Sequence, residues 1–128
     1  MNAQLNHTIV WSRDPAASAQ FLTDMLGRPA PSRFSHFHVV ELDNGVSLDY
    51  AEREAGKIVP QHYAFLIGEE DFDAVLGRIR ERQLEYWADP ARRHPGEINR
   101  NDGGRGMYFV DPSGHFLEVL TRPYGSGG

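Results

Sequence analysis

The pattern that decides the fold is written twice in this chain, as NGVSLDY over residues 44–50 and as SGHFLEV over residues 113–119. Each copy is a glycine turn followed by a strand-like run in which an acidic residue follows leucine. That acidic residue is Asp49 in the first copy and Glu118 in the second. Because side chains alternate along a strand, Glu118 is expected to share one face with Phe116 and Leu120. A carboxylate between apolar neighbours on a buried face needs a cation as a partner.

A histidine stands at the same place in each half of the chain. His7 opens the run HTIVW and His62 opens the run HYAFL, and both runs have strand character. The histidines are 55 positions apart and the two acids 69, so the second half has about 14 more residues, which fall in the loop from Arg92 to Arg105. Each half therefore reads as strand, helix, extended stretch and final strand, which predicts an internal repeat.

Local signals place the helices and turns. Asp14-Pro15 is typical of a helix start, with aspartate as the N-cap and proline at the first helical position, and Gly27 suits the end of that helix. The acidic segment 69–71 favours the start of a second helix through the helix dipole. The spacing of the next apolar residues puts them on one helix face: Phe72, Val75, Leu76 and Ile79. Asp43-Asn44-Gly45 and residues 111–114 predict hairpin turns.

Composition limits the class of protein. A chain of 128 residues is large enough for one domain with a real core. The net charge of −5 argues against a nucleic-acid partner, and no apolar run approaches the roughly 18 residues that span a membrane. Absence of cysteine excludes disulfides and thiolate metal sites. A cytoplasmic location fits best, and the glycine-rich tail, residues 122–128, is expected to be flexible.

The two histidines and the acid together predict a metal site. Two imidazoles and one carboxylate form the ligand set of open catalytic centres, which leave positions for substrate or water. We therefore expect His7, His62 and Glu118 to bind a divalent metal. His36 and His38 have the spacing of a His-x-His ligand pair. Since the repeat gives them no counterpart, we expect them to line the sheet or to face solvent.

On these residues, the chain resembles the vicinal oxygen chelate superfamily, which contains glyoxalase I, extradiol dioxygenases, fosfomycin-resistance proteins and bleomycin-binding proteins. The resemblance covers roughly residues 4–121. It implies an α+β fold of two βαβββ modules, about residues 4–54 and 59–121, whose strands form a cupped, open mixed sheet with the helices outside. It also puts His7, His62 and Glu118 at the metal-ligand positions. Asp49 lies where glyoxalase I has a fourth ligand. Two roles remain open for Asp49: a fourth metal ligand, or a hydrogen-bond acceptor or base close to the metal.

The end of the chain is similar to one branch of that superfamily. Residues 108–118, YFVDPSGHFLE, match the second part of the extradiol dioxygenase signature, Tyr-x-x-Asp-Pro-x-Gly-x-x-x-Glu. The Asp-Pro-x-Gly portion is common to the superfamily, whereas Tyr108 favours the dioxygenases and implies a hydrogen-bonding or acid role. The signature also expects a histidine six to eight residues before the tyrosine, where residues 99–101 read NRN. No glutathione-binding pattern is present.

The resemblance implies a metal-dependent enzyme that chelates a small aromatic substrate through adjacent oxygens, with Tyr108 and Asp49 as catalytic residues. An extradiol dioxygenase with Fe(II) is the favoured interpretation. A glyoxalase-type isomerase or lyase with Ni(II), Zn(II) or Mn(II) is the alternative, with Asp49 as the base. A non-catalytic drug-binding resistance protein, or a scaffold with a metal but no turnover, also remains open. Such modules commonly pair, so a homodimer is expected.

Overall fold

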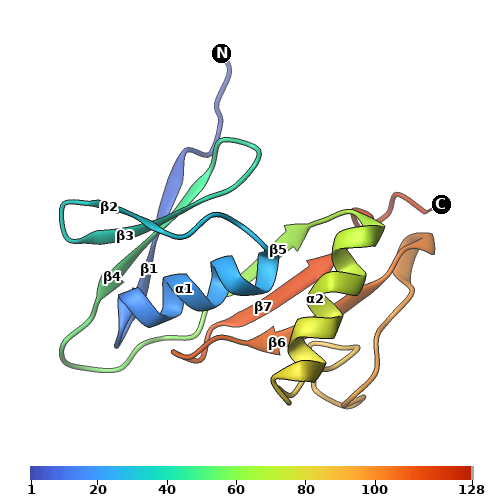
Figure 1. The fold of residues 1–128 in the computed structure, drawn as a ribbon. Helices are drawn as coiled ribbons and strands as arrows, with labels where there is room; N and C mark the ends of the chain where they lie inside the picture. Colours follow the sequence, from blue (N-terminus) through green and yellow to red (C-terminus); the bar gives the residue numbers. More distant parts are fainter. Residues whose placement is uncertain (128) are drawn as a thin grey trace. The chain divides into compact units, whose positions relative to one another are not determined.

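The computed structural model describes residues 1–127 and divides them into two compact units, one from Met1 to Val59 and one that begins at Pro60 (Figure 1). Each unit contains one helix and one mixed β-sheet, of four strands in the first unit and three in the second. This confirms the predicted α+β class built from glyoxalase- and dioxygenase-like modules. Within the described residues no helix has the length and apolar character that crossing a membrane requires.

The first unit is a complete βαβββ module. Its sheet has the order β1-β4-β3-β2, with β1 parallel to β4 and the other pairs antiparallel. A parallel pair needs a crossover connection, and the helix α1 supplies part of it. The elements are β1 (His7–Ser12), α1 (Pro15–Leu26), β2 (Ser32–Phe34), β3 (Phe37–Glu41) and β4 (Ser47–Glu52).

The second unit has the same strand order, but isolated bridges stand in place of a strand equivalent to β2. Its sheet has the order β5-β7-β6, with β5 parallel to β7. Beside β6, where β2 would stand, the described chain forms isolated bridges, from Trp87 to Tyr108 and from Asn99 to Gly106. Prolines 90 and 95 follow Trp87 and lack the N–H that a longer ladder needs. The elements are β5 (His62–Leu66), α2 (Glu69–Glu81), the short 3-10 helix η1 (Asn101–Gly103), β6 (Gly106–Val110) and β7 (Phe116–Leu120).

The predicted caps and turns are present. The Asp14 side chain accepts a hydrogen bond from the Ala17 backbone N–H at 3.0 Å, and Gly27 ends α1 in the left-handed conformation, with φ 66°. The backbone N–H of Gly45 donates to the Leu42 carbonyl at 3.2 Å, which closes the turn between β3 and β4. These contacts connect residues close in sequence, which explains why local patterns predict them.

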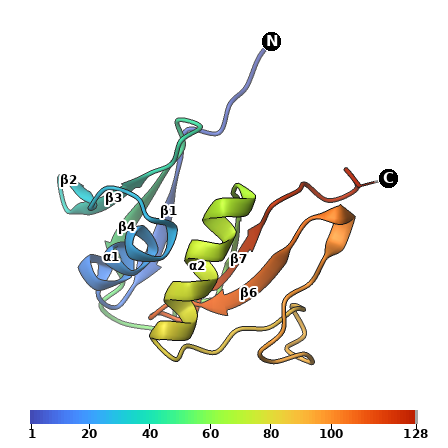
Figure 2. The same cartoon turned by 45° about the vertical axis from the view of Figure 1, so that its right-hand side comes forward.

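Each sheet buries one face. In the second unit the apolar face of α2, which contains Phe72 and Ile79, is fully buried, and both views show α2 lying across β6 and β7 (Figures 1 and 2). Strand residues that alternate with Glu118, such as Leu117 and Val119, are buried as well. Glu118 itself points to the opposite face of its strand. That second face carries the candidate site.

Candidate metal site

The two units carry their histidine and acid in the same strand register. In the first unit β1 and β4 pair His7 with Ser47, and Asp49 follows two residues later. In the second, β5 and β7 pair His62 with Phe116, and Glu118 follows two residues later. Paired residues and residues two apart point to the same face of a sheet. Each histidine therefore shares a face with the acid of its own unit.

His62 and Glu118 are in direct contact. The Nε2 atom of His62 lies 3.0 Å from the Oε1 atom of Glu118. The Glu118 side chain is 2% exposed, whereas that of His62 is 47% exposed. Two ligand atoms that each lie about 2.1 Å from one metal ion, at a right angle, are about 3.0 Å apart. The pair thus has the spacing of two adjacent ligands of one ion.

The other nitrogen of His62 fixes the tautomer of the ring. Its Nδ1 atom lies 3.0 Å from the Phe116 carbonyl oxygen, which can only accept, so Nδ1 carries the hydrogen. In the neutral ring Nε2 then points a lone pair at the Glu118 carboxylate. Two acceptors at this distance need a shared cation, either a proton on Nε2 or a metal ion. Metal-bound histidines usually donate their second N–H to a carbonyl or carboxylate in this way.

The second oxygen of Glu118 is held by a residue of the C-terminal segment. The Tyr124 hydroxyl donates to Glu118 Oε2, and the Tyr108 hydroxyl oxygen lies 3.0 Å from that of Tyr124. A hydroxyl has one hydrogen, and Tyr124 gives its own to Glu118, so Tyr108 donates to Tyr124. A line of donors therefore runs from Tyr108 through Tyr124 to the carboxylate.

Both phenols keep their protons at neutral pH. Burial raises the pKa of Tyr108 above its ordinary value, and the negative charge of Glu118 raises it further, against a lowering by the hydrogen bond with Tyr124. Burial and the hydrogen bond to Glu118 raise the pKa of Tyr124. The site thus has two neutral hydroxyl groups beside one buried carboxylate.

The segment that carries Tyr124 has contacts of its own. The Asp102 carboxylate, in η1, accepts hydrogen bonds from the backbone N–H groups of Gly125 at 3.1 Å and Gly127 at 3.3 Å. The expected flexibility of residues 122–128 stays a prediction, and Gly128 lies outside the described residues. Over residues 122–127 the structure shows this segment bonded to the same unit as Glu118.

We predict that Tyr124→Phe weakens metal binding about tenfold, because groups that hydrogen-bond to a metal ligand typically contribute at least that much. The substitution keeps the ring and removes only the donor to Glu118 Oε2. Competition with a chromogenic chelator measures the affinity for Zn(II). Tyr86→Phe is the matched control, since its hydroxyl accepts from Arg80 Nε at 3.2 Å on another part of the unit. Equal affinities in the two variants would contradict the prediction.

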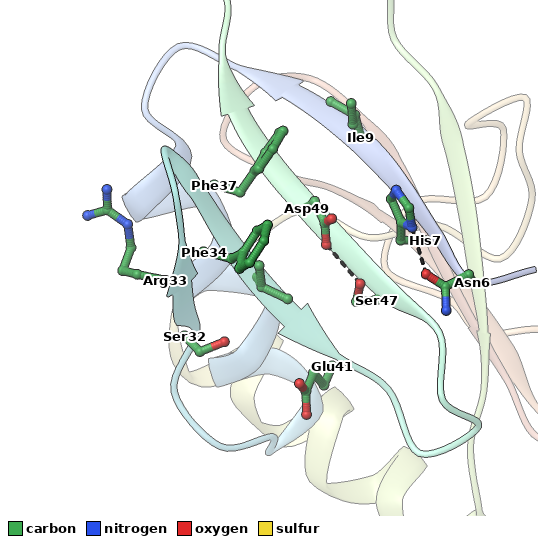
Figure 3. A pocket seen from close by; sticks show the side chains of 11 residues that line it. Asn6, His7, Ile9, Ser32, Arg33, Phe34, Phe37, Glu41, Ser47 and Asp49 are labelled. Carbon is green, nitrogen blue, oxygen red and sulfur yellow. Dashed lines mark hydrogen bonds between the residues drawn. The ribbon is translucent and has the colours of Figure 1, made fainter.

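The first unit has a looser arrangement on its corresponding face. A hollow of about 500 Å³ lies there, lined by residues that include His7, Asp49, Phe34 and Phe37 (Figure 3). The Asn6 side-chain oxygen lies 2.7 Å from His7 Nδ1, which again leaves Nε2 available. Asp49 instead accepts from the Ser47 hydroxyl at 2.8 Å. Among residues 1–127 no hydrogen bond joins His7 to Asp49.

The structure brings two of the predicted ligands together. His62 and Glu118 form a pair, and Tyr108 lies beside Glu118 across the β6–β7 register. Within residues 1–127 no three His, Asp or Glu side chains gather as a complete metal centre. His7 as the third ligand and Asp49 as a fourth ligand or base therefore stay predictions.

The other histidines have different surroundings. His38 pairs with Tyr50 across β3 and β4, which puts it on the opposite face from Asp49. His36 is exposed in the turn before β3. His115 is buried, and its Nδ1 atom accepts from the Gln61 backbone N–H at 3.0 Å. A His-x-His ligand pair on the face of Asp49 is therefore not formed.

Sequence reasoning missed two residues near the candidate site. One is Tyr124, whose only signal is an aromatic side chain in a tail of glycine and serine. The other is Arg92, whose guanidinium carbon lies 5.0 Å from the ring centres of both Trp87 and Phe116. Among the aromatic residues, Trp87 and Phe37 lie on the faces that carry the acids. Tyr50, Tyr63 and Phe65 lie on the opposite faces, as the strand pairing requires.

Two modules with one shared strand register are the arrangement that the family comparison identifies. The chain belongs to the glyoxalase/bleomycin resistance protein/dioxygenase superfamily, whose sequence model matches residues 4–119. The divalent-metal dependence that is general in this superfamily agrees with the His62–Glu118 geometry.

Particular relatives are enzymes. Oxidase ChaP-H2 is 62% identical, with a TM-score of 0.96 and coverage of 100% of both chains. Oxidase ChaP-H1 is 60% identical, with a TM-score of 0.94, over 97% of this chain and 99% of that one. Glutathione transferase FosA from Serratia marcescens is 30% identical over 126 residues, which are 93% of this chain and 81% of the relative. These similarities support an enzymatic activity in general.

Proposed function

We propose that this protein is a divalent-metal-dependent oxidase that holds an aromatic substrate through two adjacent oxygens, most like an extradiol dioxygenase. The observation that carries the proposal is the His62–Glu118 pair. The hydrogen bond from His62 Nδ1 to the Phe116 carbonyl leaves a lone pair on Nε2, and that lone pair points at the buried Glu118 carboxylate. The 62% identity with an oxidase over the whole chain supports oxygen chemistry over isomerisation. Fe(II) is the metal that suits a site of two histidines and one carboxylate in this chemistry.

The residues of the candidate site have different proposed roles. His62 and Glu118 would hold the metal, with His7 as the proposed third ligand. When bound, the metal supplies positive charge that stabilises a deprotonated substrate oxygen, and iron adds reactivity towards O2. The protonated Tyr108 and Tyr124 keep Glu118 oriented, and Tyr108 would donate to a substrate oxygen by turning its hydrogen away from Tyr124.

Aromatic rings form the wall of the proposed substrate site. The Tyr108 and Phe116 rings are stacked with centres 5.4 Å apart, and the Trp87 ring lies 6.3 Å from that of Phe116. Flat rings pack well on such a surface, which supports an aromatic substrate. Asp49 is proposed as a base or fourth ligand, and the expected homodimer and cytoplasmic location are also proposals.

The test is oxygen consumption by metal-loaded protein. The apoprotein is loaded anaerobically with Fe(II) or Zn(II) and mixed with a panel of catechols in air-saturated buffer. We expect O2 uptake and a ring-cleavage absorbance only with Fe(II), and loss of both with a chelator. A protein that binds one equivalent of iron and consumes no O2 with any catechol would contradict the proposal.

A second candidate is glutathione transfer, favoured by the 30% identity with FosA. Titration of glutathione into the metal-loaded protein by calorimetry separates it from the first. Our proposal predicts no saturable heat, whereas a transferase must bind the thiol.

A further inference from the structure

Arg92 lies on the face of the second sheet that carries the candidate ligands. Its guanidinium carbon is 5.0 Å from the Phe116 ring centre and 5.0 Å from that of Trp87. Phe116 is the β7 residue in register with His62, and its ring centre is 6.1 Å from the imidazole. One aromatic ring therefore separates the guanidinium from the candidate metal ligand.

The loop holds Arg92 in an unusual backbone conformation. Its φ of 59° is in the left-handed region, which costs energy for a residue with a Cβ. Asp89 stabilises the turn. Its carboxylate accepts hydrogen bonds from the backbone N–H groups of Arg93 at 3.0 Å and His94 at 2.9 Å. Its backbone carbonyl accepts a hydrogen bond from the backbone N–H of Arg92 at 3.2 Å. The bridges of Trp87 to Tyr108 tie the same loop to β6. The position of Arg92 is thus set by the loop and not by the side chain alone.

Arg92 has no acidic partner in the described part of the chain. Within residues 1–127 no carboxylate forms an ion pair with it, whereas Arg28 and Arg105 are each paired with acids. The nearby Asp89 carboxylate is occupied by backbone N–H groups. Stacking on Trp87 and Phe116 uses the flat face of the guanidinium and leaves the N–H edge for a ligand. Arg92 is exposed, so this edge is open to an anionic ligand beside the candidate site.

We propose that Arg92 is a subsite for a carboxylate substituent on an aromatic substrate. The inference rests on the proposed function. The substrate's adjacent oxygens reach the His62–Glu118 end, its ring lies against Phe116, and its carboxylate accepts two N–H bonds from the guanidinium. An arginine fork matches a carboxylate in this bidentate way, which a neutral substituent cannot reproduce. The substrate class is therefore a vicinal dihydroxy aromatic acid.

The experiment compares two probes, 3,4-dihydroxyphenylacetate and the uncharged 4-methylcatechol. Their dissociation constants are measured anaerobically by calorimetry with Zn(II)-loaded protein, so that no turnover is needed. Arg92→Gln is expected to weaken the carboxylate probe about tenfold and the neutral probe less than about twofold. Arg92→Lys should recover part of the loss, and Arg93→Gln, in the same loop, should match wild type.

Equal weakening of both probes by Arg92→Gln, or equal effects of Arg92→Gln and Arg93→Gln, would overturn the subsite. Far-ultraviolet circular dichroism of each variant identifies unfolding, and Arg92→Lys keeps the test valid if the glutamine variant does not fold. This result is separable from the oxidase proposal. Carboxylate selectivity without O2 uptake by the iron form would retain the subsite and reject the oxidase, whereas O2 uptake without selectivity would reject the subsite alone.

Discussion

Replacing Glu118 with glutamine is expected to lower the metal content from about one equivalent per chain to less than about a tenth. Glutamine has the shape of glutamate but no negative charge. Its amide can donate to His62 Nε2, the atom that the carboxylate faces at 3.0 Å, and so remove the lone pair that a metal needs. The buried position should tolerate the change, because a neutral side chain costs less to bury than a carboxylate. Activity should fall with the metal, by at least a hundredfold.

Elemental analysis by inductively coupled plasma mass spectrometry, after reconstitution and desalting, measures this directly. Glu85→Gln is the matched control, since it makes the same chemical change at an exposed position. The element that wild type retains is informative as well, because iron supports oxygen chemistry and zinc or nickel supports proton transfer. If the Glu118 variant retained the metal as wild type does, the site would have to be elsewhere.

Sequence predicted the parts of the fold that local interactions determine. The Asp14 cap, the Gly27 end of α1 and the turn at residues 43–45 each involve atoms a few residues apart. The internal repeat also predicted the topology, because two copies of one sequence pattern imply the same order of strands and helix in both halves. The strand registers of the two units then match, because in each unit the acid lies two residues beyond the residue that pairs with the histidine.

The parts that sequence did not predict depend on contacts between distant segments. Tyr124 reaches Glu118 only because Asp102, far earlier in the chain, fixes the segment that follows β7. Arg92 stacks on Phe116 only because the loop folds back along β6 (Figure 2). Neither contact has a periodic or local signature, and both side chains sit in segments whose composition is typical of loops.

The two copies have diverged in what surrounds the acid. Opposite Glu118 on β6 stands Tyr108, whereas opposite Asp49 on β3 stands Val39. In the place of Phe116 the first unit has Ser47, which donates to Asp49. The second unit therefore contributes a buried carboxylate, hydroxyl donors and stacking rings. The first has an exposed imidazole and a hollow lined by both apolar and polar side chains.

His7→Ala tests whether the first unit supplies the third ligand. We expect Zn(II) affinity to fall at least about a hundredfold, close to the effect of His62→Ala, because each removes one of three protein ligands. His7 is exposed, so alanine should change stability little and the loss should report on the metal alone. His36→Ala, an exposed histidine of the same unit, is the control and should bind as wild type does. If His7→Ala kept wild-type affinity while His62→Ala lost it, the second unit would hold the metal without His7. The shared register would then be a remnant of the repeat, and the search for a third ligand would move to the Tyr108–Tyr124 side of Glu118.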